Sequence, residues 1–168
     1  MDAESIETPW FAIWTRSRHE QLVRDQLEKK DVEAFLPTIP RWSRWKDRKK
    51  RIDWPLFPGY CFARFAPATR LPVLKCVGVV KIVSFNGDLA PIPSQEIEDV
   101  RRLVTSDLQY DPCPLIQEGS PVEVIHGPLK GVTGRLVRKG SQQQLILSVE
   151  LISRAVSVSV DAADVRPL

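Results

Sequence analysis

Residues 41–51 hold the densest group of side chains that could bind another molecule, because seven of them are Lys or Arg and one, Asp47, is acidic. Seven positive charges minus one negative charge leave a local charge of +6, which is enough to neutralise nucleic-acid phosphates. Trp42, Trp45 and Trp54 lie in or beside this run and could stack on unpaired bases. A solvated loop whose tryptophans pack locally explains any one of them equally well. The candidate nucleic-acid residues here are Arg41, Arg44, Lys46, Arg48, Lys49, Lys50 and Arg51.

The basic run leads directly into an apolar segment, PLFPGY, at residues 55–60. Its Pro-Gly pair favours a turn, and the residues that follow have the pattern of a strand in which Tyr60 and Phe62 share one face. If no helix covers that face, Tyr60 and Phe62 form an exposed aromatic patch with Phe57 and Trp14, and such a patch marks a protein partner. Aromatic strand residues are usually buried, so on the residues alone a place in the core is the commoner outcome.

No catalytic or metal-binding constellation is present, so we expect neither an enzyme nor a bound cofactor or metal. Cys61, Cys76 and Cys113 are isolated, without a CxxC pair or a histidine at ligand spacing, which indicates ordinary reduced thiols. His19 lies in a charged helical segment and His126 beside an HGP turn, where structural roles are expected.

Two further features of the sequence concern the acidic residues of a predicted helix and the cellular location of the protein. Glu96 and Asp99 fall near the start of a predicted helix, where we interpret them as surface charges that favour the helix dipole. The longest apolar runs are far shorter than a membrane span, and the first residues are acidic where a signal peptide would be basic. We therefore expect a cytoplasmic protein that does not bind membranes.

The first part of the chain reads as a mixture of strands and helices. A helix is predicted over residues 17–30, with Ser17 as N-cap, Glu20 at the capping-box position, and an inward face that includes Leu22, Val23, Gln26 and Leu27. A second helix, over residues 94–105, has Ser94 as its cap and Ile97, Val100, Leu103 and Val104 turned inward. Strands are predicted at residues 10–14, 32–37, 59–65 and 79–85. Their order predicts an α+β domain in which helices cover one sheet.

After a proline-containing stretch at residues 107–121 the helical signal is lost. Short alternating segments follow, separated by turns rich in Gly, Pro and Ser, at residues 121–126, 132–138, 143–151, 155–160 and 164–168. Five short strands in so few residues favour a small closed barrel.

The start of this region carries the pattern G-x-x-V-x-V-x-x-G-P-x-x-G-x-x-G, in which glycines allow tight turns and valines fill the interior. Its residues are Gly119, Val122, Val124, Gly127, Pro128, Gly131 and Gly134. This pattern resembles the KOW motif. With Trp10-Phe11, FLP at 35–37 and PLFPGY at 55–60, it resembles the NusG family of transcription elongation factors over residues 9–168.

The resemblance implies an antiparallel α+β domain of the NGN type followed by a small SH3-like KOW barrel. The implied domains are a flexible N-terminus (1–8), a domain that binds RNA polymerase (9–106), a linker (107–118) and the KOW domain (119–168). The basic Trp-bearing segment and the short chain look more like the specialised antitermination paralogues of the RfaH and UpxY type than like the housekeeping factor. The implied protein is a monomer.

Residues matching the family's polymerase-binding positions would dock on the clamp helices of the largest catalytic subunit, and they are Trp14, Phe57, Tyr60, Phe62, Thr69 and Arg70. Pro72 departs from the family pattern beside the last two. The resemblance places the basic run near upstream duplex and the non-template strand of the transcription bubble. It adds Arg16, Arg18, Lys29 and Lys30 around the first helix as DNA contacts.

In the KOW domain, Leu151, Ile152 and Arg154 match the loop that binds either Rho or the ribosomal protein NusE. Ile152 and Ser153 replace the family's aromatic residue and glycine, so we expect NusE rather than Rho, while a place for Leu151 and Ile152 in the hairpin core stays open. The Val-rich and Gly-rich sequence disfavours a switch to helix, so a permanent barrel is expected. The alternative function is a ribosome- or RNA-binding KOW protein that does not bind polymerase.

Overall fold

The computed structural model describes the backbone of residues 8–45 and 48–168, and the side chains of this range except those of residues 42–49. The predicted flexible N-terminus thus lies outside the described residues apart from Thr8. Also outside are Lys46 and the side chains of Trp42, Arg44, Trp45, Arg48 and Lys49. Contacts divide the chain into two compact units. The N-terminal unit runs up to Leu36 and includes Pro58–Ser94, and the C-terminal unit holds Pro37–Phe57 and Gln95–Leu168.

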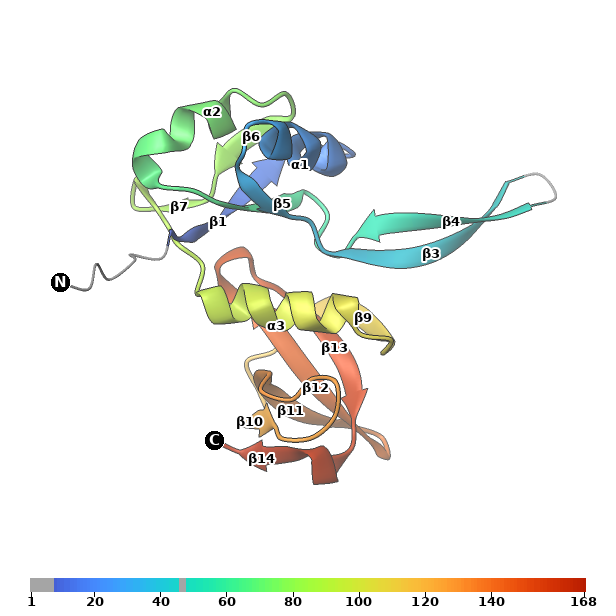
Figure 1. Ribbon diagram of the computed structural model, residues 1–168. Helices are drawn as coiled ribbons and strands as arrows, with labels where there is room; N and C mark the ends of the chain where they lie inside the picture. The colour runs from blue at the N-terminus through green and yellow to red at the C-terminus, as the bar shows by residue number, and fades with distance from the viewer. Residues whose placement is uncertain (1–7, 46–47) are drawn as a thin grey trace. The chain divides into compact units, whose positions relative to one another are not determined.

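The N-terminal unit is built on a four-stranded antiparallel sheet in the order β2-β5-β1-β6 (Figure 1). Val23 and Leu27 of α1 and Val73 of α2 pack with Phe11 and Ile13 of β1 in the core of this unit. Its elements are β1 (Trp10–Thr15), α1 (Glu20–Lys29), β2 (Glu33–Phe35), β5 (Tyr60–Arg64), a 3-10 turn η1 (Pro67–Thr69), α2 (Arg70–Leu74), β6 (Val79–Ile82), β7 (Ser84–Phe85) and β8 (Asp88–Leu89).

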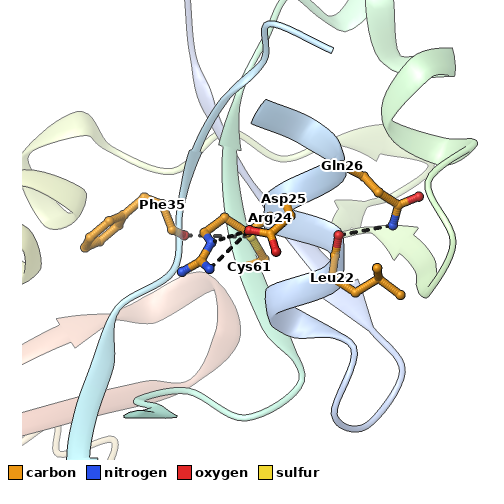
Figure 2. Close-up of polar contacts among 6 residues, drawn as sticks. All are labelled: Leu22, Arg24, Asp25, Gln26, Phe35 and Cys61. Atoms are coloured by element: carbon orange, nitrogen blue, oxygen red, sulfur yellow. Dashed lines mark hydrogen bonds and ion pairs between the residues drawn. The ribbon is translucent and has the colours of Figure 1, made fainter. Parts of the chain in front are cut away.

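Helix α1 is shorter than predicted, because it begins at Glu20 with His19 as N-cap and no side-chain cap. The prediction of Ser17 as N-cap is therefore wrong. Leu22, predicted to face inward, is 45% exposed, since the buried stripe of α1 is narrow. Gln26 is half-buried, and its amide donates to the Leu22 carbonyl at 3.2 Å and to the Val77 carbonyl at 2.8 Å. Figure 2 shows the contact with Leu22 and the pairing of Arg24 with Asp25.

Cys61 of β5 is fully buried, with its Sγ 3.9 Å from the Phe35 carbonyl oxygen (Figure 2). Burial raises the pKa of the Cys61 thiol to about 12. Cys61, Cys76 and Cys113 form no disulfide with one another, and their assignment as ordinary reduced thiols stays a prediction.

The C-terminal unit contains a six-stranded antiparallel sheet in the order β14-β10-β11-β12-β13-β9, together with the β3–β4 hairpin and helix α3. Alternate residues of β12 and β13, among them Leu145, Leu147, Val156 and Val158, are buried. The elements are β3 (Thr38–Trp45), β4 (Arg48–Pro55), α3 (Ser94–Thr105), β9 (Tyr110–Pro114), β10 (Ser120–Val124), β11 (Thr133–Lys139), β12 (Gln142–Val149), η2 (Glu150–Ile152), β13 (Arg154–Val160), η3 (Ala162–Asp164) and β14 (Val165–Pro167). The predicted fold class, α+β followed by a small all-β region, is confirmed.

The segment at residues 107–118 is not a structureless linker, because Tyr110–Pro114 forms β9 and pairs with β13. Helix α3 and the β3–β4 hairpin group with the six-stranded sheet rather than with the first sheet. This sheet, called the barrel below, has β14 and β9 as its two end strands, so the predicted closure is not seen in the strand pairing of the described residues. The units defined by contacts therefore differ from the predicted domain limits, 9–106 and 119–168. Whether the chain folds as two independent domains with those limits stays a prediction.

Candidate partner and nucleic-acid interfaces

An aromatic and cationic row crosses three strands of the N-terminal unit. Trp14 of β1 lies opposite Tyr60 of β5 on one side and opposite Lys81 of β6 on the other. Trp14 is 43% exposed, Tyr60 is half-buried, and the Lys81 Nζ stands 5.1 Å from the centroid of the indole ring. This cation–π contact holds the indole at the surface, where an apolar face with a polar edge suits a protein partner. Lys81 was not predicted from the sequence.

A turn at Gly59 sets the direction in which β5 enters this row. Gly59 has a φ of +87°, which favours glycine, and its carbonyl oxygen accepts from the Thr15 amide at 2.8 Å. The Gly59 amide donates at 3.0 Å to Oε1 of Glu20, which is buried at the start of α1. Glu20 therefore fixes the turn before β5 rather than closing a capping box. The Pro-Gly pair predicted the turn, but nothing local to Glu20 indicated this long-range role.

Phe57 and Phe62, the other two aromatics of the predicted exposed patch, are each only 1% exposed. Phe62 stacks on Phe35 of β2, with ring centroids 6.3 Å apart. The prediction of an exposed patch therefore fails for these two, and the alternative, a place in the core, holds. Phe62 shares the face of Tyr60 as the alternation predicts, but its large ring is buried.

Thr69 and Arg70 are exposed at the junction of η1 and α2. The Thr69 hydroxyl donates to the Ala66 carbonyl at 2.9 Å, and the Arg70 guanidinium donates to the Pro67 carbonyl at 3.1 Å. Both side chains thus stabilise their own turn while leaving their outer surfaces accessible.

The four basic residues predicted around the first helix fall into two separate pairs. Arg16 and Arg18 precede α1, and Arg18 adopts a φ of +65°. Lys29 and Lys30 lie at the other end of α1, about 15 Å away by the rise of a ten-residue helix. The Lys30 Nζ donates to the Pro72 carbonyl at 2.9 Å. All four are exposed, but they do not form one cluster.

In the C-terminal unit, the basic run forms a β-hairpin of two eight-residue strands (Figure 1). Arg44 lies opposite Lys49 in the register, and Trp45 lies opposite Arg48. Among the described side chains, Arg41, Lys50 and Arg51 are exposed. Arg51 pairs with Asp53 at 3.3 Å, which offsets part of its charge.

Trp54 is 48% exposed and lies opposite Ile39 near the base of this hairpin. A two-stranded ribbon has little interior, and among its described side chains Trp54, Arg41, Lys50 and Arg51 are accessible to a flat or linear ligand. The hairpin therefore combines the two chemistries that single-strand binders use, namely positive charge and exposed aromatic rings.

The KOW-type pattern is explained by local geometry in the C-terminal unit. Val122 and Val124 are buried at 2% and 3% exposure, while Gly119, Gly127 and Gly131 all have φ values near +90° to +103°. A Cβ at Gly134 would lie 2.5 Å from the Ile146 carbonyl oxygen, so only glycine allows β11 to approach β12 this closely.

The predicted partner loop is a compact turn between β12 and β13. Ile152 is buried at 5% exposure, which agrees with its reading as hairpin core, whereas Leu151 is half-buried and Arg154 is exposed. Ser153 between them has a left-handed conformation, with φ 52° and ψ 44°. The turn therefore leaves Arg154 and part of Leu151 accessible, whereas Ile152 is not.

Two acidic residues of α3 hold the barrel and are not the surface charges that the sequence predicted. Asp99 is 6% exposed, and its Oδ2 accepts from the amide and hydroxyl of Thr133 at 3.4 and 3.3 Å. Its Oδ1 accepts from Gln95 at 2.6 Å. One turn earlier, Glu96 accepts from the Glu150 amide at 3.1 Å. Periodicity cannot identify such acids, because their partners lie far away in the sequence.

Burial raises the pKa of both carboxyl groups above their ordinary values. For Asp99, hydrogen bonds from Gln95 and Thr133 act in the opposite direction without cancelling it. For Glu96, the hydrogen bond from the Glu150 amide lowers the pKa, while the Glu150 and Asp99 charges raise it further. An open pocket of about 240 Å³ lies beside these groups, between α3 and the barrel strands.

Within the described residues, no group of three or more His, Cys, Asp or Glu side chains has the arrangement of a metal site. The ring of His19 contacts the Ser17 carbonyl at 2.8 Å, and His126 lies 3.8 Å from Asp164. Among the helices in this part of the chain, none has the length and apolar character needed to cross a membrane.

Comparisons with known proteins agree with this fold. The family model described as "NusG: Transcription termination factor nusG" matches residues 8–101. "Transcription elongation factor Spt5" of Sulfolobus acidocaldarius is 32% identical over 72 residues, which make up 42% of this chain and 45% of that relative. The chain therefore matches less than half the length of this relative.

A solved structure described as "Domain interaction in Thermotoga maritima NusG" has a TM-score of 0.55 at 20% identity, with 95% of this chain and 97% of that chain covered. This likeness concerns the fold. The family match covers more than half of the chain, from the first sheet into α3. The chain belongs to the NusG family of transcription factors, which includes Spt5.

Proposed function

We propose that this protein is a transcription elongation and antitermination factor that binds RNA polymerase through its N-terminal unit and has no catalytic activity of its own. The observation that carries the proposal is the exposed row of Trp14, Tyr60 and Lys81 in a chain of the NusG family. An exposed tryptophan at the centre of a sheet is costly unless a partner covers it. We infer that the partner surface is the clamp helices of the largest polymerase subunit.

Polymerase binding is tested with purified core RNA polymerase and the full chain. Truncating Trp14 and Tyr60 together to Ala removes the two rings of the row, and we expect affinity to fall about 30-fold or more. Phe85→Ala is the matched control, because this ring is 70% exposed in the same unit but lies outside the row. Equal affinities for the double variant and the control would rule out this surface.

For the β3–β4 hairpin we propose contact with upstream or non-template DNA of the transcription bubble. Support comes from the exposure of Arg41 and Lys50 and from the register, which places Arg44 opposite Lys49 and so gathers basic residues on both strands. Replacing both with Ala should reduce the slope of log affinity against log salt by about 0.7 to 0.9 for each phosphate that is no longer neutralised. The expected ligands are the upstream duplex and the single non-template strand, which an open-bubble substrate presents together. An unchanged slope would contradict the proposed role of these two residues.

For the barrel we propose recruitment of the ribosomal protein NusE, with Rho as the second candidate, through the turn that exposes Leu151 and Arg154. Leu151→Ala combined with Arg154→Ala should weaken NusE binding and leave polymerase binding unchanged. Binding of structured RNA by the barrel without any affinity for polymerase would instead favour the ribosome- or RNA-binding alternative.

We further propose a specialised paralogue of the RfaH and UpxY type that works in the bacterial cytoplasm as a monomer. The dense basic hairpin supports this assignment. Mapping of chromosomal occupancy tests it, because a specialised factor should occupy a few long operons, whereas occupancy of most transcribed genes would identify a housekeeping factor.

A further inference from the structure

Tyr110 stands where the segment predicted to be a linker meets the basic hairpin. It is the first residue of β9, opposite Val158 of β13, and it is 9% exposed. Its hydroxyl donates to the carbonyl oxygen of Thr38 at 2.7 Å, although the two residues are 72 positions apart. Thr38 is the first residue of β3. One hydrogen bond therefore joins the edge strand of the barrel sheet to the base of the hairpin.

The phenol also lies near the second strand of the hairpin. Burial raises the pKa of Tyr110; the Asp53 charge raises it further, and the Arg51 charge lowers it. Arg51 and Asp53 are the ion pair of β4, at 3.3 Å. The Tyr110 hydroxyl thus stays protonated and able to donate. It is hydrogen-bonded to β3 and interacts electrostatically with the charged residues of β4.

The base of the hairpin is buried, whereas its described outer part is largely exposed. Leu56 donates its amide to the Pro37 carbonyl at 2.9 Å, and Leu56 and Phe57 are buried. Farther out, Arg41, Lys50 and Trp54 are exposed, while Ile39 and Ile52 are half-buried. A two-stranded ribbon is marginal by itself, so contacts at its base determine where its outer part points.

The attachment of β9 to β13 is limited in strength. Only alternate residues of an antiparallel strand donate to a given neighbour, and Pro112 and Pro114 have no amide hydrogen, so β9 can offer few donors to β13. Strand β9 is also the edge of the sheet. Its docking is therefore an equilibrium that a modest change in free energy can shift. The other strand of the pair, β13, begins at Arg154, directly after the proposed partner turn.

We propose that Tyr110 is a positioning residue: when residues 110–114 dock on β13 as strand β9, the Tyr110 hydroxyl fixes the base of the β3–β4 hairpin and hence the direction of its basic side chains. When β9 leaves β13, this anchor is removed and the hairpin loses order. The segment that contains β9 is thus a coupling element of the C-terminal unit. The effect of Tyr110 on hairpin order does not depend on the proposed function. Its effect on nucleic-acid binding does, because that effect requires the hairpin to contact DNA.

Amide hydrogen exchange of the full chain tests the anchor directly. Tyr110→Phe keeps the ring and removes one hydrogen bond, so exchange of the β4 amides and of the Leu56 amide should accelerate about 3- to 10-fold. Exchange in β12 should stay unchanged. Ser159→Ala is the matched control, because it removes a hydroxyl of β13 that bonds to Gln144 at 2.9 Å and does not reach the hairpin. Equal hairpin exchange in Tyr110→Phe, Ser159→Ala and the native chain would overturn the proposal.

A second variant tests the coupling without touching the phenol. Asp111→Pro should undock β9, because Asp111 lies opposite Ser157 in the ladder and proline disrupts that pairing. Faster exchange in the hairpin is expected although Tyr110 is intact. If exchange of the remaining β9 amides accelerates while the hairpin stays protected, the docking of β9 does not order the hairpin and the proposal fails.

Nucleic-acid binding separates this proposal from the proposed function. With a fluorescent oligonucleotide that forms an open bubble, Tyr110→Phe should lower affinity about 3- to 10-fold without changing the salt slope, because no positive charge is removed. Lys50→Ala should instead lower the slope. If the native chain does not bind the oligonucleotide, the proposed role of the hairpin in DNA contact fails, while hydrogen exchange still decides whether Tyr110 positions the hairpin.

Discussion

Replacement of Asp99 tests whether α3 is held to the barrel by a carboxylate acceptor. Asp99→Ala removes the acceptor for the Thr133 amide and hydroxyl, at 3.4 and 3.3 Å, and for Gln95 at 2.6 Å. Hydrogen bonds to charged groups contribute about 1.5 to 3 kcal/mol each, but the two bonds to Thr133 are long. We therefore expect a loss of about 2 kcal/mol in the free energy of unfolding, most of it from the Thr133 amide left without this acceptor.

Asp99→Asn separates the effect of the hydrogen-bond acceptor from the effect of the negative charge, because the amide keeps an acceptor oxygen and is neutral. The amide oxygen can still accept from Thr133, and the cost of burying a charge is removed, so stability at neutral pH should stay within about 1 kcal/mol of the native chain. Because burial raises the pKa of Asp99 above 3.8, the folded state binds more protons than the unfolded state between that value and the raised pKa. The contribution of Asp99 to stability is therefore greatest at low pH and falls as pH rises through this window. Relative to Asp99→Asn, the native chain should gain stability on acidification.

Urea unfolding followed by far-ultraviolet circular dichroism, at neutral and mildly acidic pH, measures these differences. Glu98→Ala is the matched control, since Glu98 is an exposed acid on the same helix. A double-mutant cycle with Thr133→Val should give a coupling of at least about 0.5 kcal/mol. The reasoning is refuted if Asp99→Ala matches Glu98→Ala within about 0.5 kcal/mol, or if the pH dependence of Asp99→Asn relative to the native chain has the opposite sign.

Two further predictions concern packing and reactivity. Gly134→Ala places a Cβ 2.5 Å from the Ile146 carbonyl oxygen and should cost about 2 to 3 kcal/mol, whereas Gly127→Ala, with a φ of +90° and open space around it, should cost about 1 to 2 kcal/mol. Thermal unfolding compares them, and a larger loss at Gly127 would contradict the close approach of the strands. Burial raises the pKa of Cys61 to about 12, so iodoacetamide should modify the half-buried Cys113 first in the folded chain. Mass spectrometry identifies the modified thiol, and earlier labelling of Cys61 would show that its environment opens.

The sequence predicted the features that depend on local period and turn chemistry. Alternation located the strands of the barrel, and the structure confirms each of them to within a few residues. The Pro-Gly pair before Tyr60 predicted a turn, which Gly59 makes with a φ of +87°. The glycines of the KOW pattern predicted tight turns and close approach, and Gly134 shows the latter most directly. Periodicity and turn type depend on neighbouring residues, so they can be predicted from the sequence without knowing the fold.

Other properties were decided by which elements meet in three dimensions. The sequence could place Phe62 on the face of Tyr60 but could not tell that Phe62 would be buried and Trp14 exposed. It could not distinguish the buried Asp99 from the exposed Glu98, because burial of Asp99 depends on the distant Thr133, which donates to its carboxylate together with the local Gln95. Burial and hydrogen-bond partners depend on how the elements pack in the folded chain. Periodicity predicts at most which residues share one face of a single helix or strand.

By itself, then, the sequence determined the α+β region, the β-rich region after it and the position of a basic segment between two strands, since periodicity, turn residues and charge are local. Only the tertiary structure decided that residues 110–114 are a strand rather than a linker and that Tyr110 bonds to the base of the hairpin. Segment 107–118 contains Pro112 and Pro114 and has no period, so its strand conformation arises from pairing with β13. An edge strand of this kind is stabilised by its neighbour's backbone, and no pattern within so short a segment can specify that neighbour.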